Sequence, residues 1–473
     1  MSKTVHEVDL CVIGAGSAGL STAYGAAHLG RSVVLFERDE MGGDCLNTGC
    51  VPSKALIKAA KIAHSRRTGE AFGIAPTDAT VDWDAVKAHI QGVIAQIAPV
   101  DSVERYESFG TTVITEDAHF TDAQTVESAN HVVRAKRFVV AAGSRAGVPP
   151  IPGLADVPYL TNETIFTVPD FPEHLIIIGS GPIGLEMGQS FRRLGAEVTI
   201  IDIAPPLGRS DPEHAAVLMD ALKAEGVRFR APAKTSGVSE AGGRITVSFE
   251  DGPSIAGSHI LVAAGRQPNT ETLNLDAAGV KHDRRGIDTD ETLRTSNPAV
   301  YAAGDIAAGK GGLTHAAGFH ASAIVKNLYY MPPGLGRVFA KATTNRMPSV
   351  IYTQPELGAI GEGHEAAHKT LHFAFDENDR SIAERDTAGG VKLYLDAKSN
   401  LIGASCVGSM AGEIINTVSL AMSSGAKLSE IAGIISPYPT RTEVVKRAAS
   451  SHYTDVIFGP RFRGLAGFWT RFQ

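Results

Sequence analysis

The chain opens on apolar runs separated by glycine-rich turns and helix-like segments. Apolar positions predict a strand over 8–13, a helix over 20–29 and a second strand over 32–36, and the first turn reads Gly14-Ala15-Gly16-Ser17-Ala18-Gly19. Such a turn lets the backbone approach a pyrophosphate, which rests on the helix N-terminus. Glu37 ends the second strand, where a carboxylate accepts hydrogen bonds from a ribose. The segment therefore predicts a βαβ dinucleotide-binding unit.

The same pattern returns in the middle of the chain. A strand over 175–178 precedes Gly179-Ser180-Gly181-Pro182-Ile183-Gly184, a helix runs over 186–194, and a strand over 198–201 ends on Asp202. One glycine-rich turn is weak evidence, because such turns also arise from packing alone. Two complete units, each with strand, helix and terminal acid, predict two dinucleotide sites.

The remaining pattern divides the chain further. The proline-rich stretch 147–153 reads as a linker, and a second crossing is expected near 270–280. A strand over 300–305 ends on Gly304-Asp305. Beyond residue 345 the pattern predicts strands over 350–352, 391–395 and 401–407 and helices over 412–424 and 427–432. The sequence thus predicts an α/β fold with two Rossmann-like domains, 1–147 with 276–345 and 148–275, followed by an α+β domain over 346–473.

The charge and hydropathy of the chain argue against a nucleic-acid-binding protein and against a membrane-spanning one. The 473 residues carry a net charge of −7, which gives no electrostatic reason to expect a nucleic acid partner. No apolar run is long enough to span a membrane, and the start of the chain has no signal-peptide pattern, so a cytoplasmic location is expected.

Two of the four cysteines carry the candidate chemistry. Cys45 and Cys50 lie in the segment 42–54, directly before a helix predicted over 55–64, and the positive end of a helix dipole favours a thiolate. The pattern fits a redox pair, with zinc as the rival interpretation, although zinc requires two further ligands at suitable spacing. Cys11 and Cys406 stand in apolar runs and are expected to be packing residues, so no metal site is predicted.

At this point the chain resembles a known family. The segment 42–54 is similar to the redox motif of the FAD-dependent pyridine nucleotide–disulfide oxidoreductases, and the two glycine-rich turns, 141–144, 264–269 and 303–305 follow in the order typical of that family. The resemblance covers essentially the whole chain. It implies that 1–147 with 276–345 binds FAD, that 148–275 binds NAD(P), and that 346–473 forms a homodimer and completes the partner's active site.

The resemblance also implies site residues. Cys50 would contact the flavin, Cys45 would attack the substrate disulfide, and Lys54 would lie near the flavin and pair with Glu186. The FAD site would comprise Gly14, Gly16, Ser17, Ala18, Gly19, Glu37, Gly43, Asp44, Lys54, Ala118, Gly143, Asp305, Leu313, Thr314 and His315. The NAD site would comprise Gly179, Gly181, Ile183, Gly184, Asp202 and Gly265.

One catalytic position departs from the family pattern. Disulfide reductases of this kind carry a histidine base near the C-terminus, oriented by a glutamate five residues later. Here the matching positions are Tyr438 and Glu443. A tyrosine has a reference pKa near 10, against about 6.5 for histidine, so Tyr438 accepts a thiol proton poorly at neutral pH. Either Tyr438 donates a proton or hydrogen bond, or it only packs beside a base that lies elsewhere.

The resemblance implies electron flow from NADH through FAD and a Cys45–Cys50 disulfide to an external disulfide, as in dihydrolipoyl dehydrogenase-like members. Asp202 favours NAD(H) over NADP(H), because a carboxylate there repels a 2′-phosphate. The alternative is a metal (mercuric-like), quinone or other small-acceptor reductase that uses the dithiol as a relay, and mercuric reduction is disfavoured because no cysteine follows Cys406. The basic and aromatic stretch 458–472 is expected to pack on the dimer, with membrane contact as the less favoured alternative.

Overall fold

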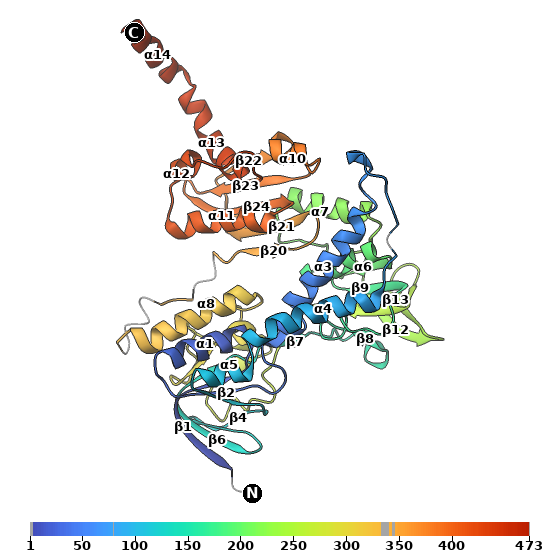
Figure 1. Cartoon of the computed structure of the whole chain (residues 1–473), viewed down its shortest axis with the longest axis vertical. Coiled ribbons are helices and arrows are strands. Elements are labelled where there is room, and N and C mark those ends of the chain that lie inside the picture. Colours follow the sequence, from blue (N-terminus) through green and yellow to red (C-terminus); the bar gives the residue numbers. More distant parts are fainter. Residues whose placement is uncertain (1–2, 79, 333–339, 343–345, 473) are drawn as a thin grey trace. The chain divides into compact units, whose positions relative to one another are not determined.

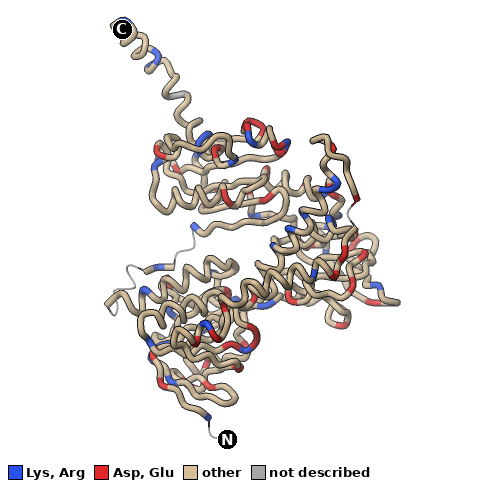
Figure 2. The backbone as a smooth tube through the Cα atoms, viewed as in Figure 1, with Lys and Arg blue, Asp and Glu red and all other residues tan. Residues whose placement is uncertain are grey.

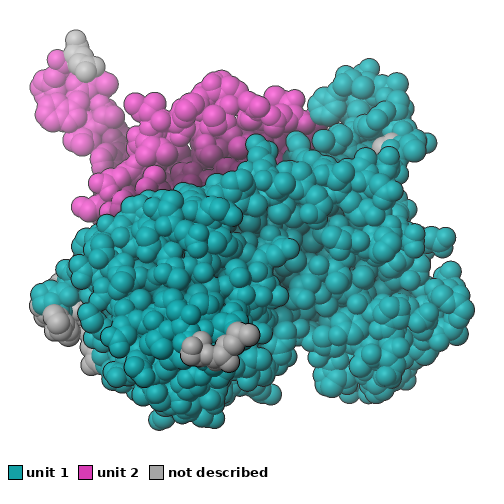
Figure 3. Space-filling model, turned by 60° about the horizontal axis from the view of Figure 1, so that its bottom comes forward, with its two compact units in different colours: residues 1–203, 230–344 teal, residues 204–229, 345–473 magenta. Residues whose placement is uncertain are grey.

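The computed structural model describes residues 3–78, 80–332, 340–342 and 346–472 (Figure 1). The chain divides into two compact units, the first made of residues 1–203 with 230–344 and the second of residues 204–229 with 345–473 (Figure 3). The expected division into three domains stays a prediction.

A seven-stranded sheet forms the centre of the N-terminal part of the first unit. Its order is β3-β2-β1-β6-β5-β4, and β19 also pairs with β6. The parallel strands are β1 (Thr4–Ile13), β2 (Val33–Phe36), β3 (Thr111–Ile114), β6 (His131–Val140) and β19 (Val300–Ala302), and the antiparallel pair is β4 (His119–Asp122) and β5 (Thr125–Glu127). The apolar runs of β1 and β2 are fully buried at their C-terminal ends, as strands of a covered parallel sheet must be.

Two helices pack side by side on this sheet. These are α1 (Ser17–His28) and α8 (Thr314–Val325) (Figure 1). The helix expected over 20–29 is confirmed but begins earlier, because its N-cap is Gly16 inside the glycine-rich turn. The start of α1 therefore lies at the carboxyl end of β1, where the alignment of parallel strands places a ligand site.

A second parallel sheet belongs to the repeated βαβ unit. Its order is β11-β10-β9-β15-β8, from β8 (Tyr159–Leu160), β9 (His174–Ile178), β10 (Glu197–Ile201), β11 (Arg228–Arg230) and β15 (His259–Val262). Helix α6 (Pro182–Leu194) packs on it, and Pro182 at its first turn suits a helix start. The sequence did not predict the antiparallel sheet of β12 (Thr235–Ala241), β13 (Arg244–Phe249) and β14 (Ile255–Gly257).

Short helices and hairpins complete the first unit. The helices are α2 (Gly43–Asn47), α3 (Cys50–Ser65), α4 (Trp83–Ile97) and α5 (Val103–Ser108). The hairpin partners are β7 (Ser144–Ala146) with β16 (Arg266–Pro268), and β17 (His282–Asp283) with β18 (Gly286–Ile287).

The second unit is an antiparallel sheet covered by helices. The sheet order is β20-β21-β24-β23-β22, from β20 (Ser349–Ile351), β21 (Glu356–Gly361), β22 (Lys369–Ala374), β23 (Gly390–Leu395) and β24 (Leu401–Gly408). The helices are α7 (Pro212–Ala224), α10 (Asp379–Ala383), α11 (Ala411–Ser424), α12 (Leu428–Gly433), α13 (Glu443–Ile457) and α14 (Pro460–Trp469). Cys406 is fully buried in the core of this unit, and Cys11 in the core of the other, as the sequence predicts.

Helix α7 joins the second unit although its sequence lies in the range expected for NAD(P) binding. Its N-cap, Asp211, accepts hydrogen bonds from the backbone of Glu213 and His214. The same carboxylate accepts from Lys392 Nζ at 2.8 and 3.0 Å and from Tyr394 Oη at 2.9 Å, both on β23. Asp211, Lys392 and Tyr394 are buried, so one carboxylate links the helix to the sheet.

Removal of the cation from this cluster is expected to destabilise the second unit. Lys392→Met leaves the Asp211 carboxylate buried without its charged partner, which costs about 3–5 kcal/mol of unfolding free energy. The measurement is the denaturant midpoint, and the matched control is the double variant Asp211→Asn/Lys392→Met, which removes both charges and keeps a capping side chain. We expect the double variant to recover most of the loss. Equal stabilities of Lys392→Met and the wild type would contradict the role of the pair.

Candidate active site

The glycine-rich turn before α1 leaves room for a ligand at one glycine only. A Cβ added at Gly14 would lie 2.5 Å from Ala141 O, and one at Gly19 would lie 1.8 Å from Gly14 O, so both glycines serve close backbone packing. A Cβ at Gly16 would meet no protein atom within 4 Å. Gly16 is the N-cap of α1, so the open space lies at a helix N-terminus, which suits a pyrophosphate.

The turn before α6 repeats this geometry. A Cβ at Gly179 would lie 2.3 Å from Ala263 O and one at Gly184 would lie 2.0 Å from Gly179 O, whereas one at Gly181 would meet nothing. The two turns therefore fit two dinucleotides in the same way.

Each turn is tied to the acid that ends its second strand. Glu37 Oε2 accepts from Ala15 N at 2.7 Å. Asp202 Oδ2 accepts from Ser180 N and Ser180 Oγ, both at 2.7 Å. Each carboxylate is thus held beside the open end of its helix, the position from which it reaches a ribose.

The two cysteines lie in different helices. Cys45 belongs to the short helix α2, and Cys50 is the first residue of α3. The expectation that both cysteines lie at the start of one helix is confirmed for Cys50 and wrong for Cys45, because Thr48 and Gly49 interrupt the chain between two helices. The structure describes Cys45 and Cys50 without a disulfide bond between them.

The pKa values of the two thiols are shifted in opposite directions. A hydrogen bond from Cys45, together with Thr314 and the charge of Lys54, lowers the pKa of Cys50 to about 6 in spite of burial. The Cys50 Sγ lies 3.2 Å from Thr314 Oγ1. The hydrogen bond to Cys50 and burial raise the pKa of Cys45. The first proton to leave the pair therefore leaves a thiolate on Cys50.

Lys54, one turn further along α3, forms an ion pair with a buried glutamate. Its Nζ lies 2.9 Å from Glu186 Oε2 in α6, the partner that the family resemblance implies. The Glu186 side chain is almost fully buried. The pair joins the redox helix to the helix of the second nucleotide-binding turn and fixes the position of a cation near the thiols.

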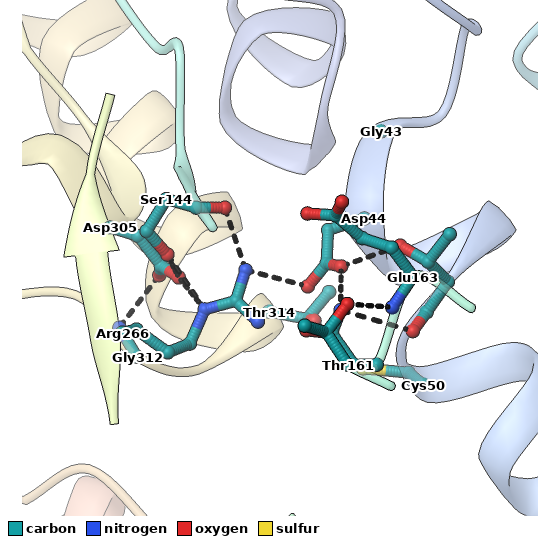
Figure 4. A network of polar contacts seen from close by, with 12 residues as sticks. Gly43, Asp44, Cys50, Ser144, Thr161, Glu163, Arg266, Asp305, Gly312 and Thr314 are labelled. Atoms are coloured by element: carbon teal, nitrogen blue, oxygen red, sulfur yellow. Dashed lines mark hydrogen bonds and ion pairs between the residues drawn. The ribbon is translucent and has the colours of Figure 1, made fainter. Parts of the chain in front are cut away.

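An arginine that the sequence did not single out connects the two candidate site carboxylates (Figure 4). Arg266 Nη2 lies 3.0 Å from Asp44 Oδ2, and Arg266 Nε lies 3.6 Å from Asp305 Oδ2. Ser144 accepts from Arg266 Nε and donates to Asp305, both at 2.7 Å. Gly312 N also donates to Asp305 at 2.7 Å. The network thus ties the α2 turn to the segment that precedes α8.

Loss of this arginine is expected to loosen the site that the family resemblance assigns to FAD. Arg266→Gln leaves Asp44 and Asp305 without the cation between them, which costs about 1–3 kcal/mol for charged hydrogen bonds. We expect a smaller fraction of bound FAD after gel filtration and a lower thermal midpoint. The matched control is Arg145→Gln on the neighbouring strand β7, which removes the exposed ion pair between Arg145 and Glu271. Equal FAD retention by the two variants would contradict the assignment.

Tyr438 and Glu443 make their bonds to different partners. Tyr438 Oη donates to Asp379 Oδ2 at 2.8 Å, and its side chain is 70% exposed. This hydrogen bond and the charge of Asp379 raise the pKa of Tyr438. Glu443, at the start of α13, pairs with Arg447 at 2.9 Å. The tyrosine is therefore a proton donor at neutral pH and not a base.

The remaining expected site residues lie around these groups. Ser17 is a hydrogen-bond partner of the Cys45 thiol, and Leu313 is the N-cap of α8. Ala118 is buried in the core beneath the seven-stranded sheet. Ala18, Gly43, Gly143, His315, Ile183 and Gly265 lie at element starts or turns of the first unit.

The described part of the chain contains neither a cluster of metal-binding side chains nor a membrane-spanning helix. Among those residues no group of three or more His, Cys, Asp or Glu side chains is placed to hold a metal ion. No described helix is long and apolar enough to cross a membrane.

The family comparisons decide between the interpretations of the cysteine pair. Residues 8–321 match the family model "pyridine nucleotide-disulphide oxidoreductase", and residues 347–449 match the dimerisation domain of the same family. The chain belongs to this family. It is a flavoprotein disulfide oxidoreductase that uses FAD and NAD(P)H and carries the family's dimerisation domain.

Several family members are similar over most of their length. A mercuric reductase of Staphylococcus aureus is 32% identical over 95% of this chain and 83% of its own. A dihydrolipoyl dehydrogenase of Thermus scotoductus is 34% identical over 95% of this chain and 98% of its own. The fold matches the HOCl-induced flavoprotein disulfide reductase RclA of Escherichia coli with a TM-score of 0.82, at 24% identity, over 93% of this chain and 99% of that one.

Proposed function

We propose that this family member reduces an external disulfide with electrons from NADH, as a dihydrolipoyl dehydrogenase-like homodimer that favours the reductive direction. The supporting observation is the contact between Cys45 and Cys50, in which Cys45, Thr314 and Lys54 make Cys50 the more acidic thiol. Bound FAD supplies the two-electron chemistry that connects NADH to the thiols.

The shared proton suits reduction. With one proton on the pair, its transfer from Cys45 to Cys50 produces a Cys45 thiolate without an outside base. That thiolate attacks one sulfur of the substrate disulfide and releases the other as a thiolate. Cys50 then gives up its proton and attacks Cys45 Sγ, which closes the Cys45–Cys50 disulfide and releases the second thiolate. One released thiolate takes the proton that Cys50 gave up, and the other takes a proton that a phenol such as Tyr438 of the partner subunit is suited to donate.

The proposed roles of the other residues follow from their positions. Gly16 and Glu37 receive the pyrophosphate and ribose of FAD, and Asp305 binds the flavin side of that cofactor. Gly181 and Asp202 do the same for NAD. Lys54 and Glu186 position a charge at the flavin.

A mercuric-type or other small-acceptor reductase is the second candidate, because relatives with the mercuric reductase name match the chain at 32–35% identity. The two candidates are separated by reducing the holoenzyme with NADH and screening lipoamide, glutathione disulfide, Hg(II) and quinones for reoxidation. Turnover of a disulfide supports the proposal. Turnover of Hg(II) or quinones alone contradicts it.

The proposed preference for NADH over NADPH depends on Asp202 and can be tested separately. The carboxylate repels a 2′-phosphate, so the wild type is expected to show the higher kcat/KM with NADH. Asp202→Asn keeps an oxygen for the Ser180 hydrogen bonds but removes the charge, and we expect the NADPH-to-NADH ratio of kcat/KM to rise by about tenfold. Steady-state kinetics with both cofactors measure this. A wild type that prefers NADPH would show that Asp202 does not decide the cofactor.

A further inference from the structure

The end of the chain exposes large apolar side chains that no described part of the molecule covers. We call residues 458–472 the C-terminal arm; it follows α13 and contains α14 and the single turn 470–472 (Figure 1). Its six large apolar side chains are each between 49% and 72% exposed: Phe458, Phe462, Leu465, Phe468, Trp469 and Phe472. About half of five aromatic side chains and one leucine amounts to roughly 500–600 Å², at the upper end of the largest apolar patch on a typical monomer.

These side chains gather on one face of the arm. Phe462, Leu465 and Trp469 recur at intervals of three and four residues, which places them on one side of a helix. Phe468 and Phe472 extend the same face, and their ring centroids lie 5.1 Å apart. The opposite face carries Arg463, Gly467 and Arg471 at successive intervals of four residues, whereas Arg461, seven residues before Phe468, lies on the apolar side.

The arm is basic in an acidic protein. Arg461, Arg463 and Arg471 are its only charged side chains, although the whole chain has a net charge of −7. Figure 2 shows blue and no red along the helix. An aromatic face opposite a basic, glycine-containing face is typical of helices that lie in a membrane interface. Its charge is complementary to anionic headgroups.

The arm also lies outside the residues that the family models match. The dimerisation-domain model matches residues 347–449 and ends before the arm begins. A ten-residue helix with two glycines is only marginally stable by itself. Nucleation of a short helix is unfavourable, and each glycine destabilises the helix by about 1 kcal/mol relative to alanine. Burial of its apolar face against another surface offsets that cost.

We propose that the C-terminal arm docks this enzyme on the surface of an anionic lipid bilayer. The aromatic face enters the boundary between headgroups and acyl chains, and the arginines reach the anionic headgroups along their flexible side chains. The thiol and nucleotide sites take no part in this contact.

The first test is cosedimentation of the full-length holoenzyme with vesicles of phosphatidylcholine alone or mixed with phosphatidylglycerol. We expect binding to the anionic vesicles, little binding to the neutral ones, and weaker binding at high salt. Replacement of all three arginines of the arm with glutamine is expected to weaken binding to anionic vesicles by roughly tenfold or more.

A second pair of variants distinguishes binding through the arm from nonspecific adsorption of exposed apolar side chains. Phe462→Ser/Trp469→Ser removes two members of the apolar face and is expected to abolish vesicle binding. Ile74→Ser removes an apolar side chain that is also exposed, but lies outside the arm, and is expected to leave binding unchanged. Both variants should reduce the acceptor disulfide at the wild-type rate.

Tryptophan fluorescence reports the contact directly. The chain contains two tryptophans, and Trp83 is buried with its Nε1 bonded to Val168 O, whereas Trp469 is exposed. In Trp83→Phe the signal comes from Trp469 alone, and anionic vesicles are expected to shift its emission to the blue. If that variant does not fold, the cosedimentation series decides the question without it.

Three results would overturn the proposal. One is the absence of binding to anionic vesicles. Another is equal binding to neutral and anionic vesicles that the arginine variant leaves unchanged. The third is a chain truncated after Ile457 that changes its oligomeric state while the full-length chain ignores vesicles, which would make a second copy the partner of the arm.

Discussion

The Cys45→Ser variant is expected to lose reduction of external disulfides by at least about a thousandfold, because the attacking sulfur is gone. Reduction of bound FAD by NADH should continue at a rate close to that of the wild type, since neither nucleotide site contains Cys45. The two rates are measured separately, by stopped flow for FAD and by steady-state kinetics for the disulfide. This split distinguishes loss of the nucleophile from loss of folding.

The Cys50 thiolate provides a check on the same variant. Serine keeps a hydroxyl that donates to Cys50 as the Cys45 thiol does, so Cys50 should still be a thiolate at pH 7.5. In the wild type, where the pKa of Cys50 is lowered to about 6, thiolate absorbance should be present above that pH and lost below it. Disulfide turnover that survives in Cys45→Ser would contradict the proposed role of Cys45 as the attacking thiol.

The parts of the site that depend on local pattern were predictable from the sequence. A glycine-rich turn between an apolar strand and a helix is formed by consecutive residues, so Gly16 and Gly181 were recognised directly, and the geometry of both turns is the one expected. The acids Glu37 and Asp202 were recognised for the same reason, since each ends a strand that lies beside its turn.

The Arg266 network was not predictable in this way. The network joins Asp44, Ser144, Arg266 and Asp305. Apart from Arg266 and Asp305, any two of these residues lie about a hundred positions or more apart along the chain. Arg266 stands in a stretch that the family order had already drawn attention to, 264–269, but nothing local shows which carboxylates its guanidinium meets. The same holds for α7, whose contact with β23 depends on a buried lysine in a strand 181 residues away.

The prediction of one helix start for both cysteines was wrong for Cys45 for a different reason. The segment between Cys45 and Cys50 contains no strong breaker except Gly49, so the pattern allowed a single helix start. Asp44 O and Asp44 Oδ1 both accept from Thr48, which ends α2, and α3 then starts afresh at Cys50. The consequence is that only Cys50 lies at the N-terminus of the long helix, which agrees with its lower pKa.

The Tyr438→His variant is expected to gain dithiol oxidation. Oxidation of a dithiol requires removal of a proton from the substrate thiol, and Tyr438, whose pKa is raised by Asp379, is protonated at neutral pH. A histidine titrates near neutral pH, and a well-placed general base is typically worth about 10²–10⁴ in rate. We therefore expect kcat/KM for dihydrolipoamide to rise by about a hundredfold, with a rate that increases as pH rises through the pKa of the new histidine.

The reductive direction should respond differently. Tyr438→Phe removes the proton donor without adding a base, so we expect disulfide reduction to fall by several-fold while the already low dithiol oxidation stays unchanged. Asp379→Asn is the matched control, because it alters the hydrogen-bond partner of the tyrosine but keeps the phenol. A wild type that oxidises dihydrolipoamide rapidly, with no loss in Tyr438→Phe, would show that another group serves as the base. Tyr438 would then be a packing residue, and the exposed phenol would have no part in choosing the direction of electron flow.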